Sequence, residues 1–177
     1  QWLQNKKVLS IKEDVKEVLF TSFNSVKFVF ITLLFTLSFV QLLLNSEYNL
    51  SNSLGIPQLI GSLFSEVGIL YIFFAPLIGA FGTFIAGSAT VSNLIFSPLQ
   101  FEASLVNSLP SELILALQTS GAAAGNMIAI HNILAVSALV NVFNQESRII
   151  KINVVIVFLY CFTTSILAYF LYFINII

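Results

Sequence analysis

The stretch PLIGAFGTFIAGSATVSNLIFSPLQFEASLV, Pro76–Val106, consists of two apolar arms around a small polar centre. The arms are Pro76–Ala86 and Leu94–Val106, and the centre is GSATVSN, Gly87–Asn93. As a helix, each arm would cross about half of the roughly 30 Å apolar core of a bilayer. Two such helices joined by a polar turn predict a re-entrant hairpin, whose turn must be buried in protein or line a wet cavity.

The composition places this hairpin in a membrane protein. Of 177 residues, 58% are hydrophobic and 8% charged, whereas soluble domains carry about 25% charged residues. Several apolar runs approach or exceed the roughly 20 residues that span a bilayer, so we expect an all-α polytopic protein surrounded by lipid. The net charge of −1 gives no field for nucleic acid. The single cysteine, Cys161, excludes an internal disulfide and a cysteine metal cluster, and no cofactor is expected.

Polar and turn-rich stretches divide the rest of the chain. Apolar residues at three- and four-residue steps between Val8 and Ser25 predict an amphipathic helix, which lies at the membrane surface or leads into the membrane. The predicted segments are this lead-in over 1–25, a span over 26–44, an interfacial helix over 58–75, the hairpin over 76–106, a broken span over 110–143 and a last span over 152–173.

Basic residues form two clusters. Five of the seven precede Phe28, and the others are Arg148 and Lys151. Cytoplasmic loops are rich in Lys and Arg, so the amino end is expected in the cytoplasm and the carboxy end outside. The segment count agrees only if the hairpin returns to the side from which it came. Because Gln1 opens the sequence without a signal-peptide pattern, we also expect a piece of a longer protein or a processed product.

A second polar break, GAAAGN, Gly121–Asn126, interrupts the apolar stretch 110–143, which as one straight helix would be about 50 Å long and exceed the membrane core. Discontinuous helices place free N–H groups and positive dipole ends at mid-membrane, where they hold small anions. Without Lys or Arg nearby, backbone and hydroxyl groups are the main means of binding a small carboxylate. The candidate binding residues are Ser88, Thr90, Ser92, Asn93, Gly121, Gly125, Asn126 and His131.

Each candidate also has a plainer interpretation. Gly121 and Gly125 form a GxxxG pattern, which is often a helix-packing face. His131, the only histidine, could relay a proton or contact substrate, or it could be neutral and hydrogen-bonded in the bundle. Glu66 and Glu102 are the carboxylates nearest the hairpin, and a position near the outer interface is favoured over proton transfer for both.

These motifs resemble those of the L-lactate permease family. The tip has the family's form GS-x-T-x-SN followed by a Phe and a Gln, here Phe96 and Gln100. The stretch LQTSGAAAGNMIAIHNILAVSA, Leu117–Ala138, is similar to the family's second Gly-rich segment. The resemblance extends from Phe28 to Tyr172 and corresponds to the carboxy-terminal part of much longer permeases. Family tips often carry Asn or Asp where this chain has Ala89, which bears on substrate, affinity or coupling.

The resemblance implies a proton-coupled importer of L-lactate and related 2-hydroxy acids such as glycolate in the plasma (inner) membrane. It further implies that the chain is one inverted repeat of an elevator-type secondary transporter. The missing amino-terminal half would then be a partner that supplies the other hairpin. The alternative is a non-transporting membrane subunit whose helix breaks serve packing with a partner. A membrane enzyme is a distant third, since one histidine without paired carboxylates or a metal set gives no reaction.

Overall fold

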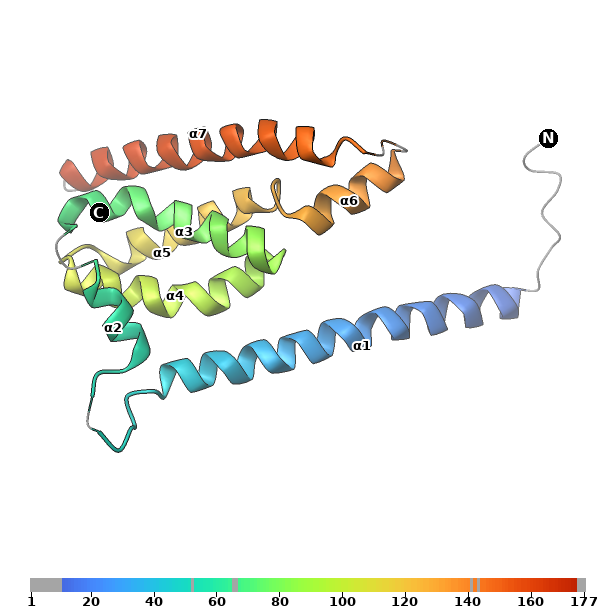
Figure 1. Ribbon diagram of the computed structural model, residues 1–177, viewed down its shortest axis with the longest axis horizontal. Coiled ribbons are helices and arrows are strands. Elements are labelled where there is room, and N and C mark those ends of the chain that lie inside the picture. Colours follow the sequence, from blue (N-terminus) through green and yellow to red (C-terminus); the bar gives the residue numbers. More distant parts are fainter. Residues whose placement is uncertain (1–10, 52, 65–66, 141, 143, 175–177) are drawn as a thin grey trace. The chain divides into compact units, whose positions relative to one another are not determined.

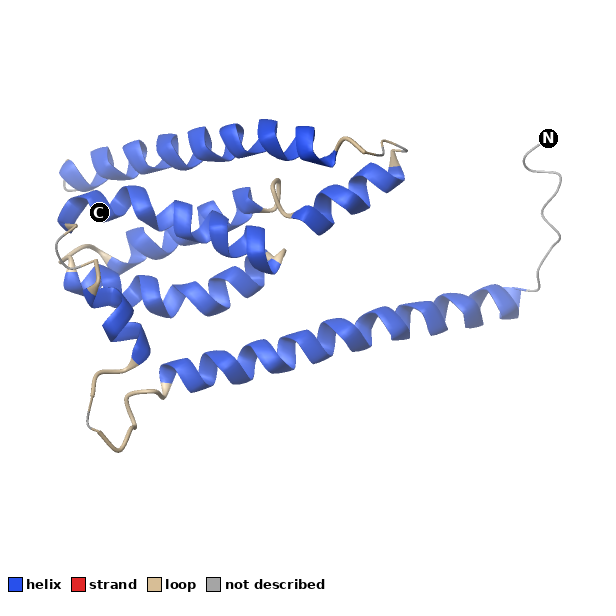
Figure 2. Ribbon diagram, viewed as in Figure 1, coloured by secondary structure: helices blue, strands red, loops and turns tan. Residues whose placement is uncertain are grey.

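The computed structural model describes residues 11–174 except 52, 65–66, 141 and 143. The described residues form helices and loops without a strand (Figure 2), which confirms the predicted all-α fold. The chain divides into two compact units, residues 1–38 and 39–177. Among the described residues, three helical stretches are long and apolar enough to cross a membrane: Gly68–Ala86, Ser111–Ser137 and Glu146–Phe173. The chain is therefore a polytopic membrane protein.

The helix α1 spans Ile11–Leu44. All the described residues of the first unit, 11–38, belong to this helix. A lead-in over 1–25 and a separate span over 26–44 were expected. From Ile11 onward the two are one continuous helix, because this stretch contains neither Gly nor Pro to interrupt it. Residues 1–10 lie outside the described residues. Within α1, the segment Leu34–Leu44 is a shorter apolar helix, so the predicted span over 26–44 stays a prediction.

The second unit contains the hairpin, whose arms are α3, Tyr71–Ala86, and α4, Ala89–Val106. The two arms lie side by side in Figure 1. They are about 24 Å and 27 Å long, so the expectation of half-length arms was wrong. The polar centre is also smaller than Gly87–Asn93. Only Gly87 and Ser88 are non-helical, because Ser88 caps α4 and lets it begin at Ala89.

The expected interfacial helix over 58–75 is divided into shorter elements. They are α2, Ile56–Ser62, the 3₁₀ turn η1, Gly68–Leu70, and the first residues of α3. The chain does not turn at Pro76, which lies inside α3. Glu66 lies outside the described residues, and Glu102 is half-buried near the end of α4 that is far from the tip.

Three further helices complete this unit: α5, Ser111–Gly125, α6, Ile130–Leu139, and α7, Glu146–Phe173. The predicted interruption of the span over 110–143 exists, but it lies at residues 126–129 instead of Gly121–Asn126. α7 begins earlier than the predicted Ile152 and includes Arg148 and Lys151. Figure 1 shows α3 between α4 and α7. α5 packs against α3, α4 and α7, and α6 packs against α7.

Glycine residues allow α3 and α5 to approach backbone to backbone. A Cβ atom added to Gly121 would collide with the carbonyl of Pro76, and one added to Gly125 would meet the backbone of Ala80. Gly79 of α3 would collide in the same way with the carbonyl of Gln118. The two glycines of the GxxxG pattern therefore pack against α3 within this chain.

Pro76 has a structural cost that α7 offsets. A proline lacks the N–H that would bond the carbonyl four residues earlier, here that of Ile72. The hydroxyl of Ser165 on α7 donates to this Ile72 carbonyl at 3.0 Å, and Ser165 is fully buried. A polar backbone group left unpaired inside a membrane protein is costly, so this bond secures α7 against the proline of α3.

Ser165→Ala is therefore expected to lower the free energy of unfolding by about 1 kcal/mol. In a Pro76→Ala background the same substitution should cost less, because an alanine in place of the proline would supply the missing N–H to the Ile72 carbonyl. Unfolding by SDS in mixed micelles measures both differences. Equal costs of Ser165→Ala in the two backgrounds would show that the bond does not compensate for the proline.

Candidate functional site

The structure brings the hairpin tip and the first turn of α6 together. His131 lies in that first turn, and its Nε2 is 2.8 Å from the carbonyl oxygen of Gly87 at the tip. A carbonyl only accepts hydrogen bonds, so Nε2 carries the hydrogen and donates it. The His131 side chain is otherwise exposed. The hairpin tip thus contacts the helix that follows the second break, although the two segments are far apart in the sequence.

The backbone of Gly87 explains why a glycine stands at this point. Its φ of 68° lies in the left-handed region, where it ends α3 and its N–H bonds the Thr83 carbonyl at 2.6 Å. A Cβ atom at Gly87 would collide with the imidazole ring of His131. The tip therefore depends on the absence of a side chain, both for its turn and for its contact with α6.

The four predicted polar side chains of the tip have different surroundings. Ser88 caps α4, because its Oγ accepts from the N–H of Val91 at 3.4 Å. Thr90 is exposed. Ser92 is fully buried, and its hydroxyl donates to the Gly79 carbonyl at 2.9 Å, which closes the hairpin on itself. Asn93 is half-buried and faces α5. Ser88, Thr90 and Asn93 thus reach the surface of the tip, whereas Ser92 supports it from inside.

Asparagine side chains hold the break between α5 and α6. The Nδ2 of Asn132 on α6 lies 3.3 Å from both the backbone oxygen and the Oδ1 of Asn126. The Nδ2 of Asn153 on α7 donates to the Met127 carbonyl at 2.7 Å. These amides satisfy carbonyl groups that the interrupted helix leaves unpaired.

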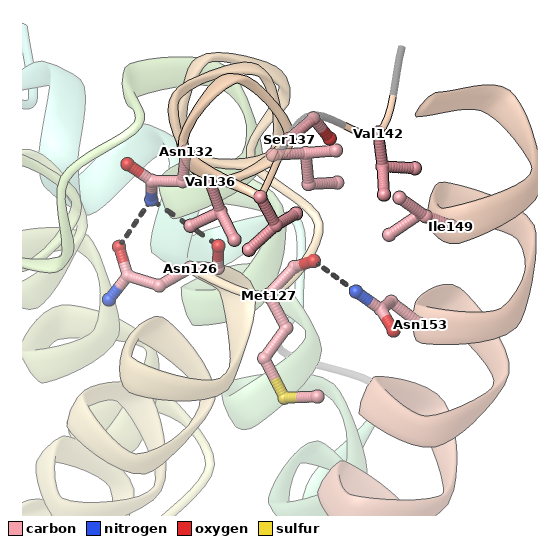
Figure 3. Close-up of a pocket in the computed structure, with 10 residues that line it drawn as sticks. Asn126, Met127, Asn132, Val136, Ser137, Val142, Ile149 and Asn153 are labelled. Carbon is pink, nitrogen blue, oxygen red and sulfur yellow. Dashed lines mark hydrogen bonds between the residues drawn. The ribbon is translucent and has the colours of Figure 1, made fainter. Parts of the chain in front are cut away.

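A pocket of about 310 Å³ lies beside this break, between α6 and α7. Figure 3 shows Asn132 directed at Asn126 and Asn153 directed at the backbone of Met127, with Val136, Val142 and Ile149 around them. Its lining is amide on one side and mostly aliphatic elsewhere. The pocket is adjacent to Asn126, but the predicted residues Gly121 and Gly125 do not line it.

Sequence analysis missed a chain of buried polar residues that extends from α3 to the tip. The hydroxyl of Tyr71 donates to Gln100 Oε1 at 2.7 Å, and Gln100 Nε2 donates to Gln118 Oε1 at 2.8 Å. Both glutamines are fully buried. Gln100 was noted only as part of a motif. The sequence did contain a signal for this network: each glutamine stands alone in an apolar helix, where an unpaired amide is costly and a buried partner is therefore expected.

The sequence has no Lys or Arg between Phe28 and Ser147, so the tip and the break contain no basic side chain of that kind. Among the described residues, no group of three His, Cys, Asp or Glu side chains is placed to hold a metal ion. Among the described residues of the tip and the break, the donors are hydroxyls, amides and the imidazole N–H of His131.

The chain is a polytopic membrane protein of the discontinuous-helix type. It combines apolar helices long enough to span a membrane with a polar-tipped hairpin, and the helix after the break touches the tip of that hairpin. The chain belongs to the L-lactate permease family, whose sequence profile matches residues 5–175. Members of this family are transporters and not enzymes.

Individual relatives agree with this assignment. A Haemophilus influenzae protein provisionally named as an L-lactate permease is 37% identical over 160 residues, which are 89% of this chain and 29% of that protein. The L-lactate permease of Bacillus subtilis is 32% identical over 59% of this chain and 18% of its own length. The glycolate permease of Escherichia coli is 29% identical over 59% of this chain and 19% of its own length. The chain thus spans less than a third of these relatives. No solved structure shows significant similarity to it.

Proposed function

We propose that this chain is the carboxy-terminal part of a permease that moves L-lactate or a related 2-hydroxy monocarboxylate, such as glycolate, together with protons. The observation that carries the proposal is the contact between His131 Nε2 and the Gly87 carbonyl, because it joins the hairpin tip to the helix that follows the second break, in a stretch of sequence without Lys or Arg. Relatives named as L-lactate and glycolate permeases support the substrate class.

The substrate carboxylate binds at the surface of the tip, next to α6. Ser88 uses its oxygen to cap α4, so its hydroxyl hydrogen is free to donate to a ligand. The exposed Thr90 hydroxyl and the Asn93 amide add further donors on the same helix end. The amino end of α4 contributes its positive dipole end, which favours an anion. Ser92 contributes indirectly, by fixing the hairpin through Gly79.

His131 takes part in proton coupling. It is the only histidine of the chain, and it donates to the tip itself. Asn126 stands in the same break and is held there by Asn132. Movement of the tip would break the bond between His131 and Gly87, so the position of the imidazole changes with substrate movement.

His131→Gln tests this role, because a glutamine amide can still donate to the Gly87 carbonyl but cannot titrate. We expect exchange of labelled for unlabelled L-lactate to be retained within about threefold, with proton-driven accumulation lost. Both are measured in vesicles with and without an imposed pH gradient. Accumulation at the wild-type level would exclude His131 from proton coupling.

The topology follows from the hairpin and the basic clusters. Because α3 and α4 are the two arms of one hairpin, the chain returns to the side from which it came, whatever depth the arms reach. With Lys and Arg on the cytoplasmic side, Arg148 and Lys151 at the start of α7 lie in the cytoplasm and the carboxy end lies outside. The plasma membrane is the proposed location. This chain supplies one inverted repeat of an elevator-type transporter, and an amino-terminal part supplies the other.

Uptake of labelled L-lactate driven by a proton gradient tests the proposed function. It is measured in cells that produce this chain alone and in cells that also produce the amino-terminal part of a lactate permease. We expect uptake only when both parts are present. Uptake by the chain alone would contradict the half-transporter assignment. A chain shown to be in the membrane without uptake in either case would favour a non-transporting subunit.

A further inference from the structure

The buried polar residues behind the tip form a continuous chain with a defined direction. From α3 toward the tip, it consists of Tyr71, Gln100 and Gln118, and it ends at Ser92 and Asn93. These residues come from α3, α4 and α5, so the chain crosses the packed centre of the bundle. Such a network can fix which group the tip presents to a ligand only if the orientation of each side-chain amide is determined.

Backbone carbonyls determine the orientation of the two glutamines. Gln100 lies 3.0 Å from the Ala75 carbonyl, which can only accept, so the group facing it must be the amide nitrogen Nε2. Its Oε1 therefore faces Tyr71 and accepts from the phenol. The same Nε2 donates to Gln118 across 2.8 Å, so the atom of Gln118 on that side is Oε1. The Nε2 of Gln118 is then directed at the tip.

At the tip, the same reasoning orients Asn93. Ser92 gives its hydroxyl hydrogen to the Gly79 carbonyl, so toward Gln118 it can only accept, at 3.4 Å. The Nε2 of Gln118 is also 3.3 Å from Asn93, and the group that accepts there is Oδ1. Asn93 therefore turns its oxygen inward and its Nδ2 donor away from Gln118, on a side chain that is half-buried.

We infer that Gln118 is a positioning residue, which acts through Asn93 so that the hairpin tip presents an N–H donor rather than a carbonyl oxygen to the anion. The inference rests on the proposed function, because the anion is the carboxylate of a 2-hydroxy acid. With the amide of Asn93 reversed, Oδ1 would face that carboxylate and repel it. An isolated amide at the surface could adopt either orientation, so the buried chain selects the one that binds.

A double-mutant cycle separates this role from a merely structural one. Gln118→Met keeps the length of the side chain but removes its donor, and Asn93→Ala removes the group through which it acts. Each single variant is expected to raise the Kd for L-lactate roughly tenfold, the loss of one hydrogen bond to a charged group. If Gln118 acts through Asn93, adding Gln118→Met to Asn93→Ala should change the Kd less than twofold.

Thr83→Val is the matched control. Thr83 is also fully buried, and its hydroxyl donates to the Ala122 carbonyl of α5 at 2.7 Å, whereas Asn93 accepts from Gln118. Whatever effect it has on the Kd should be the same with and without Asn93→Ala. All these Kd values are measured by titrating L-lactate into the purified protein, prepared in the form that transports L-lactate. Gln100→Met, one step further from the tip, serves the same cycle if Gln118→Met does not yield folded protein.

The outcomes distinguish the inference from the function on which it rests. Independent, additive effects of Gln118→Met and Asn93→Ala would overturn the positioning role while leaving L-lactate as the ligand. A wild-type protein that does not bind L-lactate would overturn the proposed function and the inference with it. Coupled effects of the two substitutions, beside additive effects of Thr83→Val, would support the inference.

Discussion

Gly121→Ala is expected to lower the free energy of unfolding by about 3 kcal/mol or more, because overpacking against a rigid neighbour leaves the added atom no room. The Cβ of an alanine at this position would collide with the backbone of Pro76, and a backbone cannot move aside as a side chain can. The contact lies at the centre of the α3–α5 packing, so α3 and with it the hairpin would be displaced. Unfolding in mixed micelles measures the loss.

The control for Gly121→Ala adds a larger side chain to the exposed face of the same helix. Ala116 is exposed on α5, and Ala116→Leu should change the free energy of unfolding by less than about 0.5 kcal/mol. If Gly121→Ala were tolerated as well as Ala116→Leu, the close approach of α3 and α5 would be wrong.

Under the proposed function, Gly87→Ala is expected to reduce L-lactate uptake by at least about tenfold, measured with the amino-terminal part of a permease also present. The loss of one hydrogen bond to the substrate carboxylate, or a small displacement of the tip, is worth that much. Two effects act at this position. The φ of 68° is unfavourable for an L-residue with a Cβ, by about 1–2 kcal/mol. The Cβ would also collide with the ring of His131, which breaks the contact between the tip and α6.

Removal of the imidazole separates the two effects. In the Gly87→Ala, His131→Ala double variant the collision is gone and only the backbone cost remains, so its thermal stability should exceed that of Gly87→Ala alone. Uptake should stay low, because the bond between His131 and Gly87 is absent in both. A double variant less stable than Gly87→Ala would contradict the packing of His131 on the tip.

Several features of the fold could be predicted because local chemistry decides them. The polar tip at Gly87 and Ser88 was found because a small polar stretch between apolar arms marks a turn. The interruption before His131 was found because the apolar stretch was too long for one span. The residues at which the helices begin and end depend on individual hydrogen bonds that the sequence pattern does not reveal. The Ser88 cap extends α4 back to Ala89, and Ser165 lets α3 continue through Pro76, since it pairs with the Ile72 carbonyl.

The candidate site could be predicted only in part, because its remaining partners come from distant positions. Ser92 has the same chemistry as Ser88, yet it is buried and bonded to Gly79, which the order of residues does not reveal. Gln118 lies on a different helix from the tip that it contacts. Gln118 and Asn93 are far apart along the sequence, and they come into contact only because α4 packs on α5.

Protection of the tip by substrate tests the binding of carboxylate there most directly. Cys161 is the only cysteine and is buried, so a Cys161→Ala background allows a thiol to be placed with Thr90→Cys at the exposed tip position. The rate of reaction with a water-soluble maleimide is then measured with L-lactate, with sulfate of equal ionic strength, and without either. Ser51→Cys, in the exposed loop before α2, is the matched control.

Binding at the tip predicts that L-lactate slows the labelling of the Thr90→Cys variant at least about fivefold, at a concentration ten times the Kd of that variant for L-lactate. Sulfate should not slow it, and labelling of the Ser51→Cys variant should not change. Equal labelling rates of the Thr90→Cys variant with and without saturating L-lactate would contradict it.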